Sequence, residues 1–258
     1  MLRRFALVVL ATFALAQAPN TKLSLVSDQS SVRPGTTVWV GVHLQLEPGW
    51  HTYWLNPGDS GEPPKVQWTL PTGFTAGPLE YPAPSRMKNP AGVDFGYHDE
   101  AIYLAKLKVP PTAKGPANIT ANVRWLACKD ICVPQKGTAT LTLKTGTAAP
   151  DPTGKPLIDA SRARLPKALP YDWKTNVITN PREILLNFMP GVKIDSAEFF
   201  PFEPQLIDNA APQKLSATSV RAQLALAKGP LAAQAKSLDG VLVLNGTDVY
   251  TVKLPIKK

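Results

Sequence analysis

Thr37–Leu46 reads TVWVGVHLQL, and its apolar residues occupy every second position. A period of two is typical of a strand with one buried face, because successive side chains of a strand point to opposite faces. Three further stretches alternate in the same way, namely Ile102–Val109, Ile119–Ala127 and Thr138–Leu143. Turn-forming clusters such as Asn56–Asp59 lie between them. The first half of the chain is therefore predicted to be an antiparallel β-sandwich.

The composition favours the same fold class for the rest of the chain. Proline supplies 27 of 258 residues, about twice its ordinary usage, and it donates no backbone hydrogen bond to a helix or a ladder. The proline content thus argues against a helical bundle or a parallel-sheet enzyme. The strand pattern resumes in four later stretches, Ile184–Phe188, Ile194–Phe200, Val220–Ala227 and Leu238–Leu244. We expect an all-β protein of two sandwich domains with few helices.

Residues 1–18 have the features of a signal peptide. Arg3 and Arg4 precede an apolar run, Phe5–Leu15, and Ala16–Ala18 supplies a small-x-small cleavage site. The run is too short for a transmembrane helix, although an uncleaved N-terminal anchor is the competing interpretation. The mature chain is expected to be soluble, without a transmembrane segment, and periplasmic or otherwise exported.

The mature chain divides into two domains on its sequence pattern. Residues 19–146 are predicted to form the first domain and residues 171–258 the second. Residues 147–170 are predicted to be a linker, in which Leu157–Leu169 is compatible with a short helix that stops at Pro166 or Pro170.

Charge and residue counts exclude several function classes. The net charge is +9, but the Lys and Arg residues are scattered, which argues against nucleic-acid binding. Three His and two Cys exclude a His-rich metal centre, and the two Cys lack a second pair at zinc-ligand spacing. We therefore expect neither a cofactor nor a metal.

The pair Cys128 and Cys132 is the one motif in the sequence that suggests a chemical reaction. Its C-x3-C spacing differs from the C-x-x-C of thioredoxin-like sites. On an extended strand the two Cα atoms would lie about 13 Å apart, whereas a disulfide needs about 5.5–6 Å. The chain must therefore turn back between them, at a strand end or a hairpin tip.

Two interpretations of the pair remain open on physical grounds. A structural staple is one, but a loop this short stabilises a fold by only about 2 kcal/mol in the chain-entropy model. A redox-active pair is the other, because a short ring held by a turn is easier to reduce.

Five segments in order resemble the periplasmic N-terminal domain of the thiol:disulfide interchange protein DsbD, in the variety found in ScsB proteins. They are Trp50–Gly61, Trp68–Phe74, Tyr81–Arg86, Phe95–Tyr97 and Trp125–Pro134. The resemblance covers roughly residues 22–145, and it is weaker in the C-terminal half, through Ala197–Pro201 and Ala210–Gln213. It implies immunoglobulin-like sandwiches with a redox-active Cys pair.

The resemblance also implies roles for individual residues. Cys132 would attack and form the mixed disulfide, and Cys128 would resolve it. Phe95 best matches an aromatic residue on a cap loop that shields the pair, with Tyr97 as the alternative. Asn89–Tyr97 is rich in turn-forming residues and is expected to be that loop.

Two neighbours of the pair complete the expected site. Tyr53 matches an aromatic position beside the cysteines. His51 falls in the same segment, either as an aid to proton transfer or as a bystander.

The predicted function is that of an exported thiol–disulfide electron-transfer module of the protein-disulfide reductase type. The chain lacks the membrane channel and the terminal thioredoxin-like domain of full-length DsbD, so its electrons are expected from a separate DsbD-type membrane protein. Its expected substrates are exported thioredoxin-like or disulfide isomerase-like proteins. The alternative is a non-catalytic immunoglobulin-like adaptor with a structural disulfide, linked to copper tolerance or cytochrome maturation.

Overall fold

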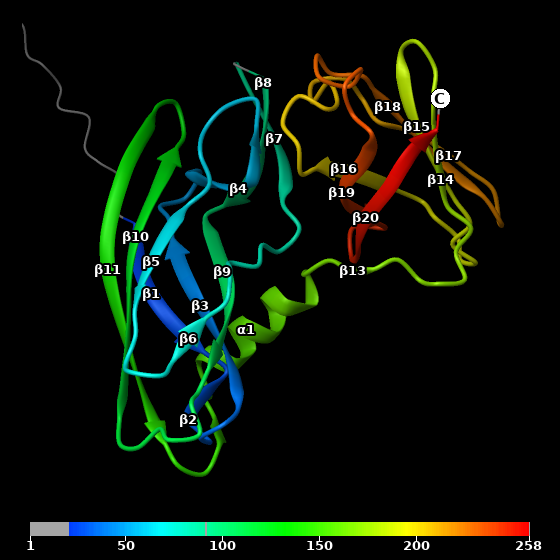
Figure 1. Ribbon diagram of the computed structural model, residues 1–258. Helices are drawn as coiled ribbons and strands as arrows, with labels where there is room; N and C mark the ends of the chain where they lie inside the picture. Colours follow the sequence, from blue (N-terminus) through cyan, green and yellow to red (C-terminus); the bar gives the residue numbers. More distant parts are fainter. Residues whose placement is uncertain (1–20, 91, 258) are drawn as a thin grey trace, which may run out of the picture.

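The stretch TVWVGVHLQ forms β3 (Thr37–Gln45), a central strand of the first of two β-sandwiches. The structure is a computed structural model that describes residues 21–90 and 92–257, and the expected signal peptide lies outside them. The prediction of an all-β fold with two immunoglobulin-like sandwiches and few helices is confirmed (Figure 1). No helix within the described ranges is long and apolar enough to cross a membrane.

The first sandwich consists of two sheets. The smaller sheet has the order β1-β3-β9-β6, with β1 at Lys22–Ser27, β9 at Glu100–Lys108 and β6 at Thr75–Ala76. The larger sheet has the order β12-β2-β11-β10-β4-β8-β7, and β5 pairs with β10 beside this path. Its strands are β12 (Ala149–Pro150), β2 (Gln29–Val32), β11 (Cys132–Thr145), β10 (Ala117–Cys128), β4 (His51–Gly58), β8 (Gly92–His98), β7 (Ser85–Asn89) and β5 (Lys65–Thr69).

The core of this sandwich lies between the inward faces of its sheets. Val38, Val40 and Val42 of β3 are fully buried, as the alternation requires, and they face Val123 and Trp125 of β10 in one cluster. Asn122 and Arg124, which alternate with these core residues of β10, point outward and are exposed. Strand β10 therefore presents one face to the core and one to solvent.

The segment 147–170, predicted as a linker, contains three short elements. β12 pairs with β2 of the first sandwich, and β13 (Lys167–Ala168) pairs with β20 of the second. Between them α1 (Gly154–Ala163) begins three residues before the predicted helix. It can include Pro156 because the first turn of a helix needs no donor there. Ile158 is fully buried against Ile102 and Leu104, so α1 packs on the first sandwich.

The second sandwich is one path of strands that bends around a second core. The order is β16-β19-β20-β14-β15-β18-β17, and β20 connects the two layers because Asp248–Pro255 pairs with β19 and its last residues, Ile256 and Lys257, pair with β14. The strands are β14 (Asn176–Thr179), β15 (Glu183–Phe188), β16 (Ala197–Pro201), β17 (Lys214–Ala217), β18 (Ala222–Ala227), β19 (Ser237–Leu244) and β20 (Asp248–Lys257).

The two sandwiches meet through a buried apolar cluster. Trp54 and Phe95 of the first sandwich pack with Phe200 and Val241 of the second. The ring centroids of Trp54 and Phe200 lie 6.2 Å apart, and those of Phe95 and Phe200 lie 5.2 Å apart. We call this cluster the interface cluster; it joins β4 and β8 to β16 and β19 (Figure 1).

Polar contacts surround the interface cluster. The Asn56 side chain donates to the carbonyl oxygen of Pro201 at 2.8 Å, and Asn209 donates to the carboxylate of Asp59 at 2.8 Å. Arg86 donates to the carbonyl oxygen of Asn209. The apolar and polar contacts together fix the second sandwich against β4 and β8.

Candidate active site

The cysteine pair closes the tip of the β10–β11 hairpin. Cys128 is the last residue of β10 and Cys132 the first of β11, and they are register partners with Cα atoms 4.1 Å apart, joined by a disulfide. The expectation that the chain turns back between the two residues is confirmed. Cys128 is buried with 1% of its surface exposed, whereas Cys132 is exposed. An incoming sulfur can thus reach Cys132 and not Cys128.

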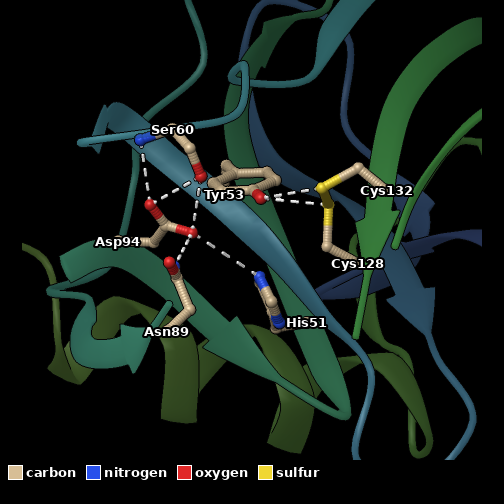
Figure 2. Close-up of a disulfide and its surroundings, with 7 residues drawn as sticks. All are labelled: His51, Tyr53, Ser60, Asn89, Asp94, Cys128 and Cys132. Carbon is tan, nitrogen blue, oxygen red and sulfur yellow. Dashed lines mark hydrogen bonds and ion pairs between the residues drawn. A yellow bond between two sulfur atoms is a disulfide. The ribbon is translucent and has the colours of Figure 1, made fainter. Parts of the chain in front are cut away.

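Tyr53 provides the polar contact to both sulfur atoms. Its hydroxyl donates to Sγ of Cys128 at 3.0 Å and lies 3.4 Å from Sγ of Cys132 (Figure 2). Strand β4 positions the ring, because His51 of β4 is the register partner of Cys128. The hydroxyl of Tyr103 donates to the carbonyl oxygen of Tyr53 at 2.9 Å.

A glycine makes room for the Tyr53 ring. Gly61 has φ +85°, and a Cβ atom built on it would overlap the ring carbons of Tyr53. Any larger residue at this position would therefore push the ring away from the sulfurs or strain the backbone. The packing of Tyr53 therefore requires glycine at position 61.

A buried carboxylate lies on the other side of Tyr53. Asp94 accepts hydrogen bonds from the backbone N–H and the hydroxyl of Ser60, both at 2.9 Å, and from the Asn89 side chain at 2.6 Å (Figure 2). β8 carries Asp94 and pairs with the end of β4, which brings these residues together. The carboxylate is thus held by at least three donors despite being 1% exposed.

His51 connects the carboxylate to the disulfide side of the site. Its Nε2 lies 3.9 Å from Oδ2 of Asp94, and its ring meets the ring of Tyr53 edge-on at 5.4 Å. Burial and the neighbouring His98 lower the pKa of His51 below 6.5. His51 is therefore neutral at neutral pH.

Burial also controls the protonation of Tyr53 and Asp94. Burial, and then the negative charge of Asp94, raise the pKa of Tyr53 to about 12. Burial raises the pKa of Asp94 above 3.8, although the hydrogen bonds from Ser60 act in the opposite direction. Tyr53 consequently remains a hydrogen-bond donor to sulfur throughout the ordinary pH range.

The prediction that Asn89–Tyr97 forms a loop is wrong. Asn89–Tyr97 falls mainly in β7 and β8, which pair from Ser85 with Gly96 to Asn89 with Gly92, so most of the segment is paired strand and not an open loop. Phe95 is fully buried in the interface cluster, with the Arg86 guanidinium 5.8 Å from its ring. Tyr97 donates to the carbonyl oxygen of Pro82 at 2.7 Å and packs edge-on against Tyr103.

The structure thus brings together Cys128, Cys132, Tyr53 and His51 of the predicted residues. We propose interface packing, instead of a cap, as the role of Phe95. Ser60, Asn89 and Asp94 were not predicted, because their segments read as turns and only the β4–β8 pairing brings them to Tyr53. Among residues 21–90 and 92–257 no group of three or more His, Cys, Asp or Glu is arranged to hold a metal ion.

Comparison with known families finds a match to the first sandwich. The family model described as "Thiol:disulfide interchange protein DsbD, N-terminal" matches residues 22–144. The crystal structure of the N-terminal periplasmic domain of ScsB from Proteus mirabilis matches with a TM-score of 0.66 at 17% identity, covering 95% of this chain and 96% of that chain. A search of curated protein sequences returned no match.

Tandem immunoglobulin domains also match at low similarity. A titin tandem has a TM-score of 0.23 at 10% identity, with coverage of 92% of this chain and 97% of that chain. The N-terminal Ig1-2 module of a Drosophila receptor protein tyrosine phosphatase, DLAR, has a TM-score of 0.23 at 12% identity, with coverage of 94% and 100%.

Proposed function

Residues 22–144 form a DsbD N-terminal-like domain, and we propose on this basis that the chain is a thiol–disulfide exchange module that reduces disulfides of other proteins. The observation that carries the proposal is the pairing of an exposed Cys132 with a buried Cys128 under one tyrosine hydroxyl. A purely structural disulfide has no need of this asymmetry.

The first step uses the exposed sulfur. In the reduced protein the Cys132 thiol loses its proton to water, and the thiolate attacks one sulfur of the partner's disulfide. A Cys132–partner disulfide forms, and the other partner sulfur leaves and takes up a proton. Ile131, 54% exposed at the hairpin tip beside Cys132, gives the partner an apolar surface to contact.

The second step uses the buried sulfur. The Cys128 sulfur attacks Sγ of Cys132, the intramolecular disulfide re-forms, and the second partner sulfur leaves and takes up the proton of Cys128. Two electrons and two protons pass from the domain to the partner in total. A hydrogen bond from Tyr53 to sulfur stabilises negative charge there, which assists both attack and departure.

The partners we propose are thiol–disulfide proteins outside the cytoplasm. Exported thioredoxin-like or disulfide isomerase-like proteins would receive the electrons, and a separate DsbD-type membrane protein would supply them. The family description of residues 22–144 supports an interaction with thiol–disulfide proteins in general.

The reduction potential of the Cys128–Cys132 pair tests the proposal. The full chain is equilibrated in glutathione buffers, and the oxidised fraction is measured by thiol alkylation. We expect a potential above about −300 mV, because structural disulfides of exported proteins have lower values. A lower value, together with no electron transfer to a disulfide-bonded thioredoxin-like protein, would support the adaptor with a structural disulfide instead.

A further inference from the structure

Three positive side chains form a row across the outer face of the first sandwich. Arg124 of β10 is the register partner of Lys65 on β5 and of Lys136 on β11. All three residues are exposed. Like charges directly opposite one another destabilise a sheet, so nothing in the folding of the sandwich favours this arrangement. We call these residues the cation row.

Acidic neighbours leave most of this charge uncompensated. Glu62 lies 3.2 Å from the Nζ atom of Lys65, but both side chains are more than half exposed, and such pairs contribute little. In the described parts of the chain no salt bridge reaches Arg124 or Lys136. Asp130 in the hairpin turn is the acidic residue nearest in sequence to the cysteines.

The cation row lies on the same face as the disulfide. Along β10 and β11 the cross-strand pair Arg124–Lys136 is followed by Leu126–Pro134 and then by Cys128–Cys132. Residues two apart on a strand share a face, so the cation row is about 14 Å from the disulfide. A hollow of about 350 Å³ lies between the cation row and the disulfide. It is lined by Pro63, Leu126 and Pro134 together with all three cations and with Glu62, the acidic partner of Lys65.

The hollow continues away from the disulfide. A second hollow of about 660 Å³ shares the cation row and extends along Gln67, Asn122 and Thr138. The face therefore offers, in line, a reactive sulfur, an apolar step, a row of positive charge and a polar floor. An extended peptide segment bound along this face would contact these features in that order.

We propose that this face binds an extended acidic segment of the partner protein, with carboxylates on the cation row while the partner's cysteine meets Cys132. The inference rests on the proposed function and adds the chemistry of the partner. At about 3.4 Å per residue, the carboxylates belong three to five residues from the partner's reactive cysteine. An apolar side chain between them would occupy the step formed by Leu126 and Pro134.

Two synthetic peptides test the proposal with the reduced full chain. Each has one Cys joined to 2-nitro-5-thiobenzoate in a mixed disulfide, and the residues three to five positions away are Glu in one peptide and Gln in the other. Release of the coloured thiol gives the second-order rate. We expect the Glu peptide to react about tenfold faster at low ionic strength and this advantage to vanish in high salt.

Charge variants show whether the cation row is responsible. Arg124→Glu and Lys136→Glu should abolish the advantage of the Glu peptide, and Arg124→Gln should reduce it. Lys253→Glu makes the same change of net charge on an exposed residue of the second sandwich and should leave the advantage intact. The uncharged hydroxyethyl disulfide should react at one rate with every variant, which checks that the site is folded.

The possible outcomes separate the two proposals. Equal rates for the Glu and Gln peptides, or an equal loss of the advantage with Lys253→Glu, would overturn the acidic-segment proposal while leaving thiol–disulfide exchange in place. Failure of both peptides and of hydroxyethyl disulfide to react would instead overturn the proposed function.

Discussion

The hydroxyl of Tyr53 donates to Sγ of Cys128 across 3.0 Å, although 75 residues separate the two in the sequence. A hydrogen bond to a charged group contributes about 1.5–3 kcal/mol, and about 1.4 kcal/mol corresponds to one pKa unit. We expect Tyr53→Phe to raise the pKa of a cysteine thiol in the reduced protein by about one unit. The pH dependence of iodoacetamide alkylation measures this, and an unchanged profile would show that the hydroxyl does not act on the thiolate.

The difference in exposure between the cysteines predicts which one traps a partner. Cys128→Ser should leave Cys132 able to form a mixed disulfide that does not collapse, because the resolving sulfur is absent. Cys132→Ser should give few adducts, since Cys128 is 1% exposed. Non-reducing electrophoresis of extracts from cells that express each variant checks this. More adduct from Cys132→Ser than from Cys128→Ser would reverse the roles.

The burial of Phe95 predicts a loss of stability without a change in thiol reactivity. Truncation of a buried Phe to Ala costs about 3–5 kcal/mol, and Phe95 is fully buried beside Phe200. Phe95→Ala should therefore lower the urea midpoint strongly. Phe200→Ala, which removes the other ring of the same contact, should act alike.

The oxidation rate of Phe95→Ala distinguishes packing in the interface cluster from a cap over the disulfide. With Phe95 in the interface cluster, glutathione disulfide should oxidise the folded, reduced variant at the wild-type rate. Faster oxidation with a nearly unchanged urea midpoint would mean that Phe95 covers the disulfide after all.

The raised pKa of Asp94 predicts a specific dependence of stability on pH. Between the unfolded value of 3.8 and the higher native value, the native protein binds a proton that the unfolded chain has lost. Stability therefore falls as the pH rises through this range. Asp94→Asn removes this dependence, so the variant should gain stability relative to wild type as the pH rises from below 3.8 through this range.

Urea unfolding at several pH values tests the prediction for Asp94. Any constant effect of lost hydrogen bonds cancels when only the change with pH is compared. Asp172→Asn, at an exposed position, controls for the loss of one carboxylate. Parallel curves for Asp94→Asn and wild type would contradict the prediction.

Local pattern was sufficient for the hairpin that carries the cysteines. The alternation in Ile119–Ala127 and Thr138–Leu143 identified the two strands, and disulfide geometry required the turn between Cys128 and Cys132. Both are properties of short stretches of sequence. The same holds for β3, whose valines alternate because one face of the strand is buried.

Contacts between distant segments could not be predicted in this way. Asn89, Pro90 and Gly92 are turn-forming residues, and they suggested a loop where β7 and β8 pair as antiparallel strands. Phe95 was expected to cover the cysteine pair because the surface that buries it, around Phe200, belongs to the second sandwich. Burial of Asp94 depends in turn on the pairing of β8 with β4.

Neighbouring positions of one strand serve different purposes, since Tyr53 contacts the sulfurs and Trp54 enters the interface cluster. An excised fragment that ends near residue 146 would leave Trp54, Val93 and Phe95 facing water. Exposed apolar patches of this kind promote self-association. We therefore expect the first sandwich to aggregate when it is produced alone. A fragment for expression should extend through β20 and not stop at the end of the family match.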